Sequence, residues 1–555
     1  MSSTYLLGVL IAAAAPRVFG QAQHAQTPFQ LASEVGEQAW DTEPSIDATG
    51  HLLFNSVSSL MQRWPNTVVR PGHSIAPCIV PAGTVFYHGR PSSSIPTEPD
   101  WLAFDFEHAY NFARGESGHV LTFATTRPLR LVYFDGSSAA KVADGAYDTQ
   151  EIVMYNEVRD DGRLGWGEDV RIKHLCEWGV PRGIDGFVRM EFHFEVMQCN
   201  FTEGLQLLSA GDVLPHDDPR PWQHAPSRSG PSGVRISRDR PDSALSSTSD
   251  DEPKPPRRRP GGPPKPAPSG WRGSLPATGD EARVAGKWHD RAPGETRVRI
   301  LYDKLITFYD PAVTSLLELR RGKPREQHRL KGISLEEAAM KARELEEVTQ
   351  VWDDSGRSGV DWGSITHVVI ERYAQRLELL AHTLSNASYP GSRERAAKAR
   401  AQVLMMLAPY FTTADSPRDD EAAADKAWLA PVVQRCSTTH TFGIPAGLLT
   451  PQERLIHGAV EDVTHEICRR LGRMFHAAFD VENAQLGEKT VEDVVHFMRS
   501  EVDALMEWLD WTAVWLKCRP ECSIEEMCIV PTWPFRRGED KNDTRHPYCV
   551  PMPNV

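Results

Sequence analysis

The sequence predicts an α+β N-terminal domain of small antiparallel sheets with helices, a long disordered linker, and an all-α C-terminal domain with a cysteine-rich tail. Three observations support this fold class. Strand-like and helix-like runs alternate before residue 213, aliphatic residues almost disappear between 214 and 296, and helical periodicity covers most of the chain after 297. A chain of 555 residues is also too long for one hydrophobic core. We therefore expect five segments, at 1–22, 24–213, 214–296, 297–517 and 518–555.

The first segment, 1–22, has the pattern of a signal peptide. An apolar run from Tyr5 to Ala15 is followed by the small residues Gly20 and Ala22, and this run is too short to cross a bilayer. A buried N-terminal helix is the alternative interpretation. No later stretch offers the roughly 18 uninterrupted apolar residues of a spanning helix. We expect a secreted, extracellular protein without a membrane span.

The cysteine content and the glycosylation sequons fit a secreted protein, and the net charge bears on its partners. Six of the nine cysteines follow the linker and could form three disulfides, while the three before it leave one odd thiol. Sequons at Asn200, Asn386 and Asn542 predict a glycoprotein. The net charge of −14 argues against nucleic acid as a partner, because nucleic-acid binding relies on Lys and Arg.

Within 24–213, strand and helix signals follow one another. Apolar and β-branched residues predict a short strand over 84–87 that ends at His88-Gly89-Arg90-Pro91, and Asp105 stands at the N-cap of a helix carrying Tyr110. Two further strands are expected at 119–124 and 129–134. Residues 187–197 alternate between apolar and polar side chains, which predicts a single strand whose polar face holds Arg189, Glu191, His193 and Glu195.

The order of a Tyr87-His88-Gly89 strand end and a helical Tyr110 resembles the ADP-ribosyltransferase superfamily, in its diphtheria-toxin and poly(ADP-ribose) polymerase branch with a His-Tyr-Glu triad. The resemblance implies that NAD is the substrate, that His88 and Gly89 bind its adenosine side, and that Tyr110 stacks on nicotinamide. It also implies a catalytic carboxylate on a late strand, for which Glu191 is the candidate. Arg90 departs from the family pattern, in which Ser or Thr usually follows His-Gly.

Two functions are therefore expected as alternatives. The first is NAD-dependent ADP-ribosyl transfer to an unidentified protein acceptor, or NAD cleavage, by a secreted protein. The second is a non-enzymatic secreted interaction protein or effector, whose helical domain binds a host partner. The sequence leaves the oligomeric state open.

The linker and the helical domain differ sharply in composition. Residues 214–296 are rich in Pro, Ser, Gly and charge, so they cannot bury enough apolar surface to offset the ordering of the chain. After residue 297, helices are expected at 300–319, 334–352, 365–384, 393–407, 419–436, 451–479 and 491–517. Ser334 suits an N-cap, and Pro451 suits a first helical turn.

No metal site is expected. The late cysteines lack the paired CxxC spacing of structural zinc sites, so we favour disulfides. His457, Glu461 and His465 recur every four residues, but such a face is more simply a polar helix surface. Cys176 could form a nucleophile set with His174 and His193, yet no known local motif surrounds it and a structural role is favoured.

Overall fold

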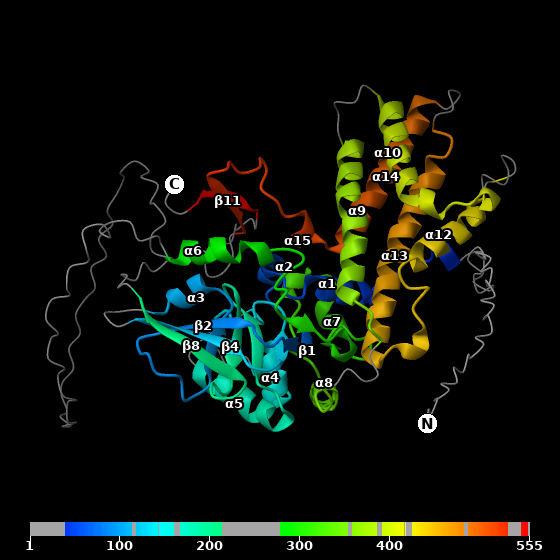
Figure 1. The fold of residues 1–555 in the computed structure, drawn as a ribbon. Coiled ribbons are helices and arrows are strands. Elements are labelled where there is room, and N and C mark those ends of the chain that lie inside the picture. Colours follow the sequence, from blue (N-terminus) through cyan, green and yellow to red (C-terminus); the bar gives the residue numbers. More distant parts are fainter. Residues whose placement is uncertain are drawn as a thin grey trace, which may run out of the picture.

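The computed structural model describes residues 39–113, 118–142, 144–159, 167–213, 278–352, 358–385, 391–415, 417, 425–481, 487–530 and 546–552. The expected signal peptide and most of the expected linker lie outside these residues. The described chain combines one large sheet, flanked by helices, with a group of long helices (Figure 1).

Ten strands of the described chain form one mixed, curled sheet, in the order β10-β1-β5-β6-β7-β3-β2-β4-β8, with β9 also paired to β1. The pair β5–β6 is parallel and the other pairs are antiparallel. The strands thus form one large mixed sheet rather than the expected small antiparallel sheets. The strands are β1 (Ser74–Val80), β2 (Val85–Arg90), β3 (Asp100–Ala103), β4 (His119–Thr125), β5 (Leu129–Phe134), β6 (Gly186–Met190), β7 (Phe194–Gln198), β8 (Leu205–Asp212), β9 (Arg299–Ile300) and β10 (Ile306–Thr307).

Short helices cover the sheet. One face packs against α4 (Asp148–Tyr155), α5 (Glu168–Gly179) and α8 (Leu335–Val348), through a core that includes Val132, Phe187, Leu175 and Leu345. On the strand β2 side, α3 (Phe106–Tyr110) packs against the sheet, and α6 (Thr278–Ala285) packs on α3 (Figure 1). A turn after β5 is fixed by Asp135, whose carboxylate accepts hydrogen bonds from the backbone N–H groups of His73 and Ser74 at 2.7 and 2.8 Å.

The second part of the chain is helical, as expected. Four long helices lie side by side, and the amphipathic α1 (Gly50–Ser59) packs on two of them, α13 and α9 (Figure 1). One cluster of buried apolar side chains runs from Leu131 and Tyr133 of the sheet to Ile467 and Leu505 of these helices. The sheet and the helices therefore share a core. The helices are α2 (Arg63–Val68), α7 (Leu317–Arg320), α9 (Trp362–Ser385), α10 (Ser392–Leu407), α12 (Ala430–Thr438), α13 (Pro451–Ala477), α14 (Glu488–Leu509) and α15 (Thr512–Trp515).

Helix starts follow their local sequence signals. The Ser334 hydroxyl accepts a hydrogen bond from the Glu337 N–H at 3.2 Å, as its position before α8 predicts. Pro451 occupies the first turn of α13, and Thr450 and Glu453 form a reciprocal capping box in front of it. These caps satisfy backbone donors that have no partner inside the helix.

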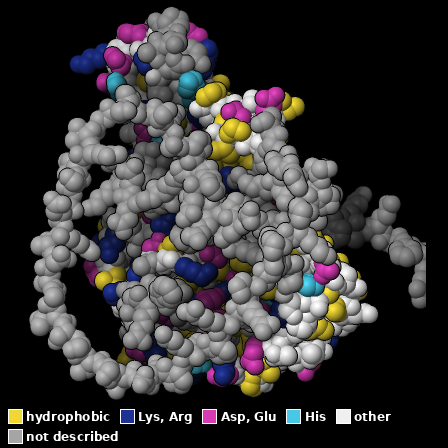
Figure 2. All heavy atoms as spheres, turned by 90° about the vertical axis from the view of Figure 1, so that its left-hand side faces the viewer, with side chains coloured by type: hydrophobic (Ala, Val, Ile, Leu, Met, Phe, Trp, Pro, Cys, Tyr) yellow, Lys and Arg dark blue, Asp and Glu magenta, His cyan; other side chains and the backbone are white. Residues whose placement is uncertain are grey.

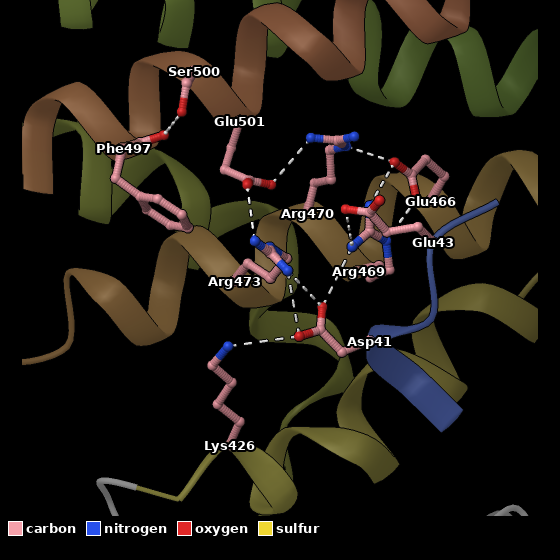
Figure 3. A network of polar contacts seen from close by, with 10 residues as sticks. All are labelled: Asp41, Glu43, Lys426, Glu466, Arg469, Arg470, Arg473, Phe497, Ser500 and Glu501. Atoms are coloured by element: carbon pink, nitrogen blue, oxygen red, sulfur yellow. Dashed lines mark hydrogen bonds and ion pairs between the residues drawn. The ribbon is translucent and has the colours of Figure 1, made fainter. Parts of the chain in front are cut away.

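A buried ionic network joins the start of the described chain to α13 and α14 (Figure 3). Asp41, from the 3-10 helix Ala39–Asp41, contacts Arg469 and Arg473 at 3.4 and 3.2 Å. The side chains of Arg469 and Glu466 are both fully buried, and they bond to each other at 2.7 Å. Since an unpaired buried charge is costly, this network positions the N-terminal segment against α13.

Three expected segments differ in the structure. Residues 187–197 form the hairpin β6–β7 rather than one strand, with Met190 paired to Phe194. Residues 299–307, expected in the helical domain, add β9 and β10 to the edge strand β1. Residues 278–296, expected in the linker, contain α6 and the 3-10 helix Gly286–His289.

The expected disulfide arithmetic is confirmed. Three bridges join the late cysteines and one joins two early cysteines, which leaves Cys78 as a buried free thiol. Because Cys176 is bonded to Cys199, it cannot act as a free nucleophile. The bridges are Cys176–Cys199, Cys436–Cys468, Cys518–Cys528 and Cys522–Cys549, and the last two flank the strand pair β11 (Glu526–Ile529) and β12 (Tyr548–Pro551).

None of the described helices has the length and apolar character needed to cross a membrane, as expected. Seen from the left-hand side of Figure 1, the described side chains of both charge signs are interspersed with apolar ones (Figure 2).

Candidate metal centre

Three segments that are far apart in the chain meet beside the ends of β3 and β7. Asp105 immediately precedes α3, His193 lies in the turn between β6 and β7, and His289 ends a short 3-10 helix. The sheet register brings the first two together. Ala103 of β3 faces Glu195 of the antiparallel strand β7. Asp105, two residues after Ala103, and His193, two residues before Glu195, are therefore neighbours. The chain that follows α6 then carries His289 to the same place.

The separations of the ligand atoms fit one small ion. Asp105 Oδ2 lies 3.5 Å from His193 Nδ1 and 3.7 Å from His289 Nε2. One ligand atom from each of the three side chains lies within 4.8 Å of the other two. Two atoms bound to one tetrahedral zinc ion at about 2.1 Å would be about 3.4 Å apart. Hydrogen bonds between nitrogen and oxygen are shorter, at about 2.7–3.2 Å. The geometry therefore suits shared ligation better than direct hydrogen bonding.

These side chains also have unused polar atoms in a buried place. The imidazoles of His193 and His289 are each 1% exposed. Neither ring nitrogen of either histidine, and not Asp105 Oδ2, has a hydrogen-bond partner among the described residues. Buried polar groups in native proteins nearly always have a partner, so two neighbouring histidines without any require an explanation.

The electrostatics prepare Asp105 and His193 for a cation. Burial raises the pKa of the Asp105 carboxyl, but the imidazoles of His193 and His289 and the guanidinium of Arg297 outweigh burial and hold this pKa well below 3.8. Burial holds the pKa of His193 well below 6.5, although Asp105 opposes this. An ionised carboxylate and a neutral imidazole are the protonation states that metal binding needs.

A surrounding layer fixes the ligands. Arg297 Nη2 lies 3.2 Å from the second carboxylate oxygen of Asp105, and Arg297 is itself held by Glu295 at 2.7 Å. The Phe192 ring stacks on His193 with centroids 4.4 Å apart. Gly286 lies directly on that imidazole, because a Cβ at this position would be 2.3 Å from His193 Cε1. Such outer partners orient metal ligands and tune their affinity.

His108 offers a further nitrogen close to the cluster. It lies in α3, one turn after Asp105, and its ring centroid is 5.4 Å from that of His193. Its Nδ1 atom is buried without a hydrogen-bond partner among the described residues, and burial lowers its pKa to about 4. His108 is thus a neutral neighbour that stands beside the three-ligand set.

The residues predicted to bind NAD occupy packed positions. His88 is buried in β2, where its Nδ1 atom lies 2.8 Å from the Trp101 carbonyl oxygen and its Nε2 atom 3.5 Å from Asp100. A Cβ on Gly89 would be 1.8 Å from the Ala109 carbonyl oxygen, so glycine is needed for the close approach of α3 to β2. The structure therefore brings His88 and Gly89 beside the helix of Tyr110.

Tyr110 and Glu191 lie on different elements, α3 and the β6–β7 turn. Tyr110 is half-buried in α3, with its ring centroid 6.0 Å from that of Phe106. Glu191 lies in the β6–β7 turn, where its carboxylate is 3.8 Å from Lys141 Nζ, and strands β7 and β3 separate β6 from β2. Glu195, expected on the same polar face as Glu191, instead pairs with the buried Arg189 at 2.8 Å.

Local sequence patterns do not reveal this cluster. Asp105 was assigned only as an N-cap, and it occupies that position, but its side chain makes no capping hydrogen bond. His193 was placed on the polar face of a long strand, and His289 was placed in the linker. The available signal was the Lys287-Trp288-His289-Asp290 motif, whose tryptophan is unusual in a stretch otherwise poor in bulky apolar residues.

Comparisons with known proteins give relatives without assigned functions. Residues 45–119 and 114–219 match a family model described as the YPL277C N-terminal domain. The uncharacterized protein YOR389W of Saccharomyces cerevisiae (strain ATCC 204508 / S288c) is 24% identical over 548 residues, covering 87% of this chain and 81% of that protein. The uncharacterized protein YPL277C of the same yeast is 28% identical over 211 residues, covering 29% of this chain and 43% of that protein. No solved structure matches.

These findings correct the family assignment. The matching family model is that of the YPL277C N-terminal domain and indicates no ADP-ribosyltransferase, so the expected resemblance to that superfamily is wrong. The roles predicted for His88, Gly89, Tyr110 and Glu191 rested on that resemblance, and NAD binding stays an untested prediction without family support. The matched range includes Asp105 and His193, whereas His289 lies beyond its end at residue 219.

Proposed function

We propose that this is an exported metal-binding protein that holds one divalent transition-metal ion between Asp105, His193 and His289. The observation that carries the proposal is the convergence of one carboxylate and two buried imidazoles whose ring nitrogens have no hydrogen-bond partner among the described residues. Two nitrogen donors and one oxygen donor suit zinc and its first-row neighbours, whereas calcium and magnesium prefer all-oxygen sites. Zinc is therefore the first probe.

The role proposed for the ion is structural and non-enzymatic. Closed sites are typical of structural zinc, while catalytic zinc keeps a position open to substrate. Here both histidines are 1% exposed, and the Asp105 side chain is 12% exposed. The ion would fasten the segment 286–297 to the sheet, and its binding free energy would then add to the stability of the fold.

Export is proposed on independent grounds. The apolar run from Tyr5 to Ala15 favours a signal peptide. Four disulfides suit an oxidising compartment, because cytosolic proteins of this kind keep their thiols reduced.

The test uses the full chain, recovered from a secretory host, loaded with zinc and then dialysed. Mass-spectrometric metal analysis is expected to find about one zinc per chain, and chelation is expected to lower the melting temperature. His289→Ala should lose the ion. Asp105→Asn, which keeps the side-chain shape, gives the same test if the first variant does not fold.

A matched control is His457→Ala. His457 also lies near a carboxylate, at 3.8 Å from Glu461, but outside the three-ligand cluster. This variant should keep the zinc content of the wild type. Equal zinc content in wild type, His289→Ala and Asp105→Asn would overturn the proposal.

A further inference from the structure

A basic cavity lies on another part of the molecule, where the amino end of α1, the loop after α7 and the carboxyl end of α14 meet. Its volume of about 590 Å³ falls in the range of roughly 300–1,000 Å³ that small-molecule sites occupy. Its charged and titratable lining residues are Arg320, Arg321, Lys323, Arg325, His51 and His328 on the basic side, and Asp47, Glu507 and Asp510 on the acidic side.

A second cavity, of about 710 Å³, lies beside Glu453 and Glu295. These two buried acids already have partners. Trp362 Nε1 donates to Glu453 at 3.2 Å, and Arg297 contacts Glu295 at 2.7 Å. The basic cavity of about 590 Å³ differs, because its buried cations have unused donors.

Arg320 is the clearest of these cations. Its side chain is 6% exposed, and its guanidinium lies 4.6 Å from the centre of the Tyr309 ring. Nη1 donates to the Phe308 carbonyl oxygen at 2.9 Å, while Nε and Nη2 have no hydrogen-bond partner among the described residues. Leaving a buried charge without a counter-ion strongly destabilises a protein. The buried positive charge of Arg320 therefore favours the binding of an anion in the cavity.

Arg325 adds a second buried guanidinium to the same lining. It is 7% exposed, and its Nε atom forms an ion pair with Asp510 at 3.3 Å but has no hydrogen-bond partner among the described residues. Burial, and to a smaller extent the charges of Arg325 and His328, lower the pKa of His51 to about 3. His51 is therefore neutral, and the positive charge that Arg325 places beside it would attract an anion into the cavity.

The helix α1 adds a weaker attraction for negative charge. Its amino end faces the cavity through Thr49 and His51, and the Thr49 side chain makes no capping hydrogen bond. Free N–H groups and the helix dipole favour an anion at such an end. Together with the two buried arginines, this end gives the cavity hydrogen-bond donors from two separate segments.

We infer that this cavity binds a phosphate group carried by a small molecule, through Arg320 and Arg325. The planar fork of a guanidinium matches phosphate oxygens in a bidentate manner, and a charge-assisted pair of this kind is stronger than a neutral hydrogen bond. The volume exceeds that of a bare phosphate ion and leaves room for the group that bears it. The site shares no residue with the proposed metal centre, so each proposal stands or falls alone.

The test is calorimetric titration of the full chain, in chloride buffer of constant ionic strength, with inorganic phosphate and with glycerol 3-phosphate. Glycerol is the uncharged control. Vesicles with and without phosphatidic acid distinguish a lipid headgroup from a soluble phosphate ester. We expect binding of the phosphate-bearing probes, and a loss of at least about tenfold in affinity in Arg320→Gln.

Two variants keep the test decisive. Arg325→Gln is expected to weaken binding in the same way, and it replaces Arg320→Gln if the latter does not fold. Arg499→Gln changes the net charge equally at an exposed pair with Asp503 and should bind like the wild type. Binding to phosphatidic acid vesicles alone would assign the phosphate to a lipid and still support the site. The inference is overturned if no phosphate-bearing probe binds, or if both cavity variants bind as tightly as the wild type.

Discussion

Replacing Gly286 by Ala tests whether the segment 286–289 holds the imidazole of His193 in place. The added Cβ would lie 2.3 Å from Cε1, 2.4 Å from Nε2 and 2.8 Å from Nδ1 of that ring, whereas ordinary contact begins at 3.4 Å. One side must therefore retreat by about 1 Å, in a packed region that resists such movement. Metal–ligand distances tolerate changes of only about 0.2 Å. The ring and the ion cannot both keep their places.

We expect Gly286→Ala to lower zinc affinity by about 10–100-fold, the usual effect of disturbing the layer around a metal site. The free energy of unfolding of the metal-free protein should fall by about 1–3 kcal/mol, as it does when a core is overpacked. Competition with a chromophoric chelator measures the first quantity, and denaturant unfolding measures the second.

The control is Gly458→Ala in the middle of α13, where nothing lies within 4 Å of the added Cβ. That change should stabilise the protein by about 0.5–1 kcal/mol, because Gly is a poor helix former, and should leave zinc affinity unchanged. If Gly286→Ala kept both the zinc affinity and the stability of the wild type, the packing described around His193 would be refuted.

Two further predictions concern buried charge. Burial raises the pKa of Asp135 from 3.8 to about 7, so its contribution to stability is complete below pH 3.8 and is lost as the pH rises through about 7. Between those limits the wild type should lose about 4 kcal/mol more than Asp135→Asn, which denaturant unfolding at several pH values measures, and parallel curves would contradict this. In the network of Figure 3, Glu466→Gln leaves the fully buried Arg469 poorly compensated and should cost about 3–5 kcal/mol. Glu394→Gln, at an exposed pair, should cost less than about 1 kcal/mol in the same assay, and equal losses in the two variants would count against the network.

Local signals predicted much of the fold. Residues 129–134 form β5 as expected, because β-branched and aromatic residues follow a proline, and the helix starts at Ser334 and Pro451 follow their capping residues. The hairpin β6–β7 was missed because its turn, Glu191 to His193, contains no Gly, Pro, Asn or Asp and continues the alternation of the strands.

Very short strands and contacts between distant segments could not be predicted from local sequence patterns. β9 and β10 have two residues each, too few to show a period, so their attachment to β1 could not be predicted. The metal centre depends on the pairing of β3 with β7 and on the return of the chain through α6. Asp105, His193 and His289 therefore have no fixed spacing, unlike ligands that share one helix or one loop.

The central claim is that one metal ion is bound by two imidazoles and one carboxylate. X-ray absorption at the zinc edge of the zinc-loaded full chain tests this most directly. We expect nitrogen and oxygen neighbours at about 2.0–2.2 Å, together with the outer-shell signal of two imidazoles, which His289→Ala should reduce. Sulfur neighbours at about 2.3 Å would instead place the ion on thiolates of Cys518, Cys522 and Cys549, the other group of described residues that could hold one once their disulfides are reduced, and would contradict the claim.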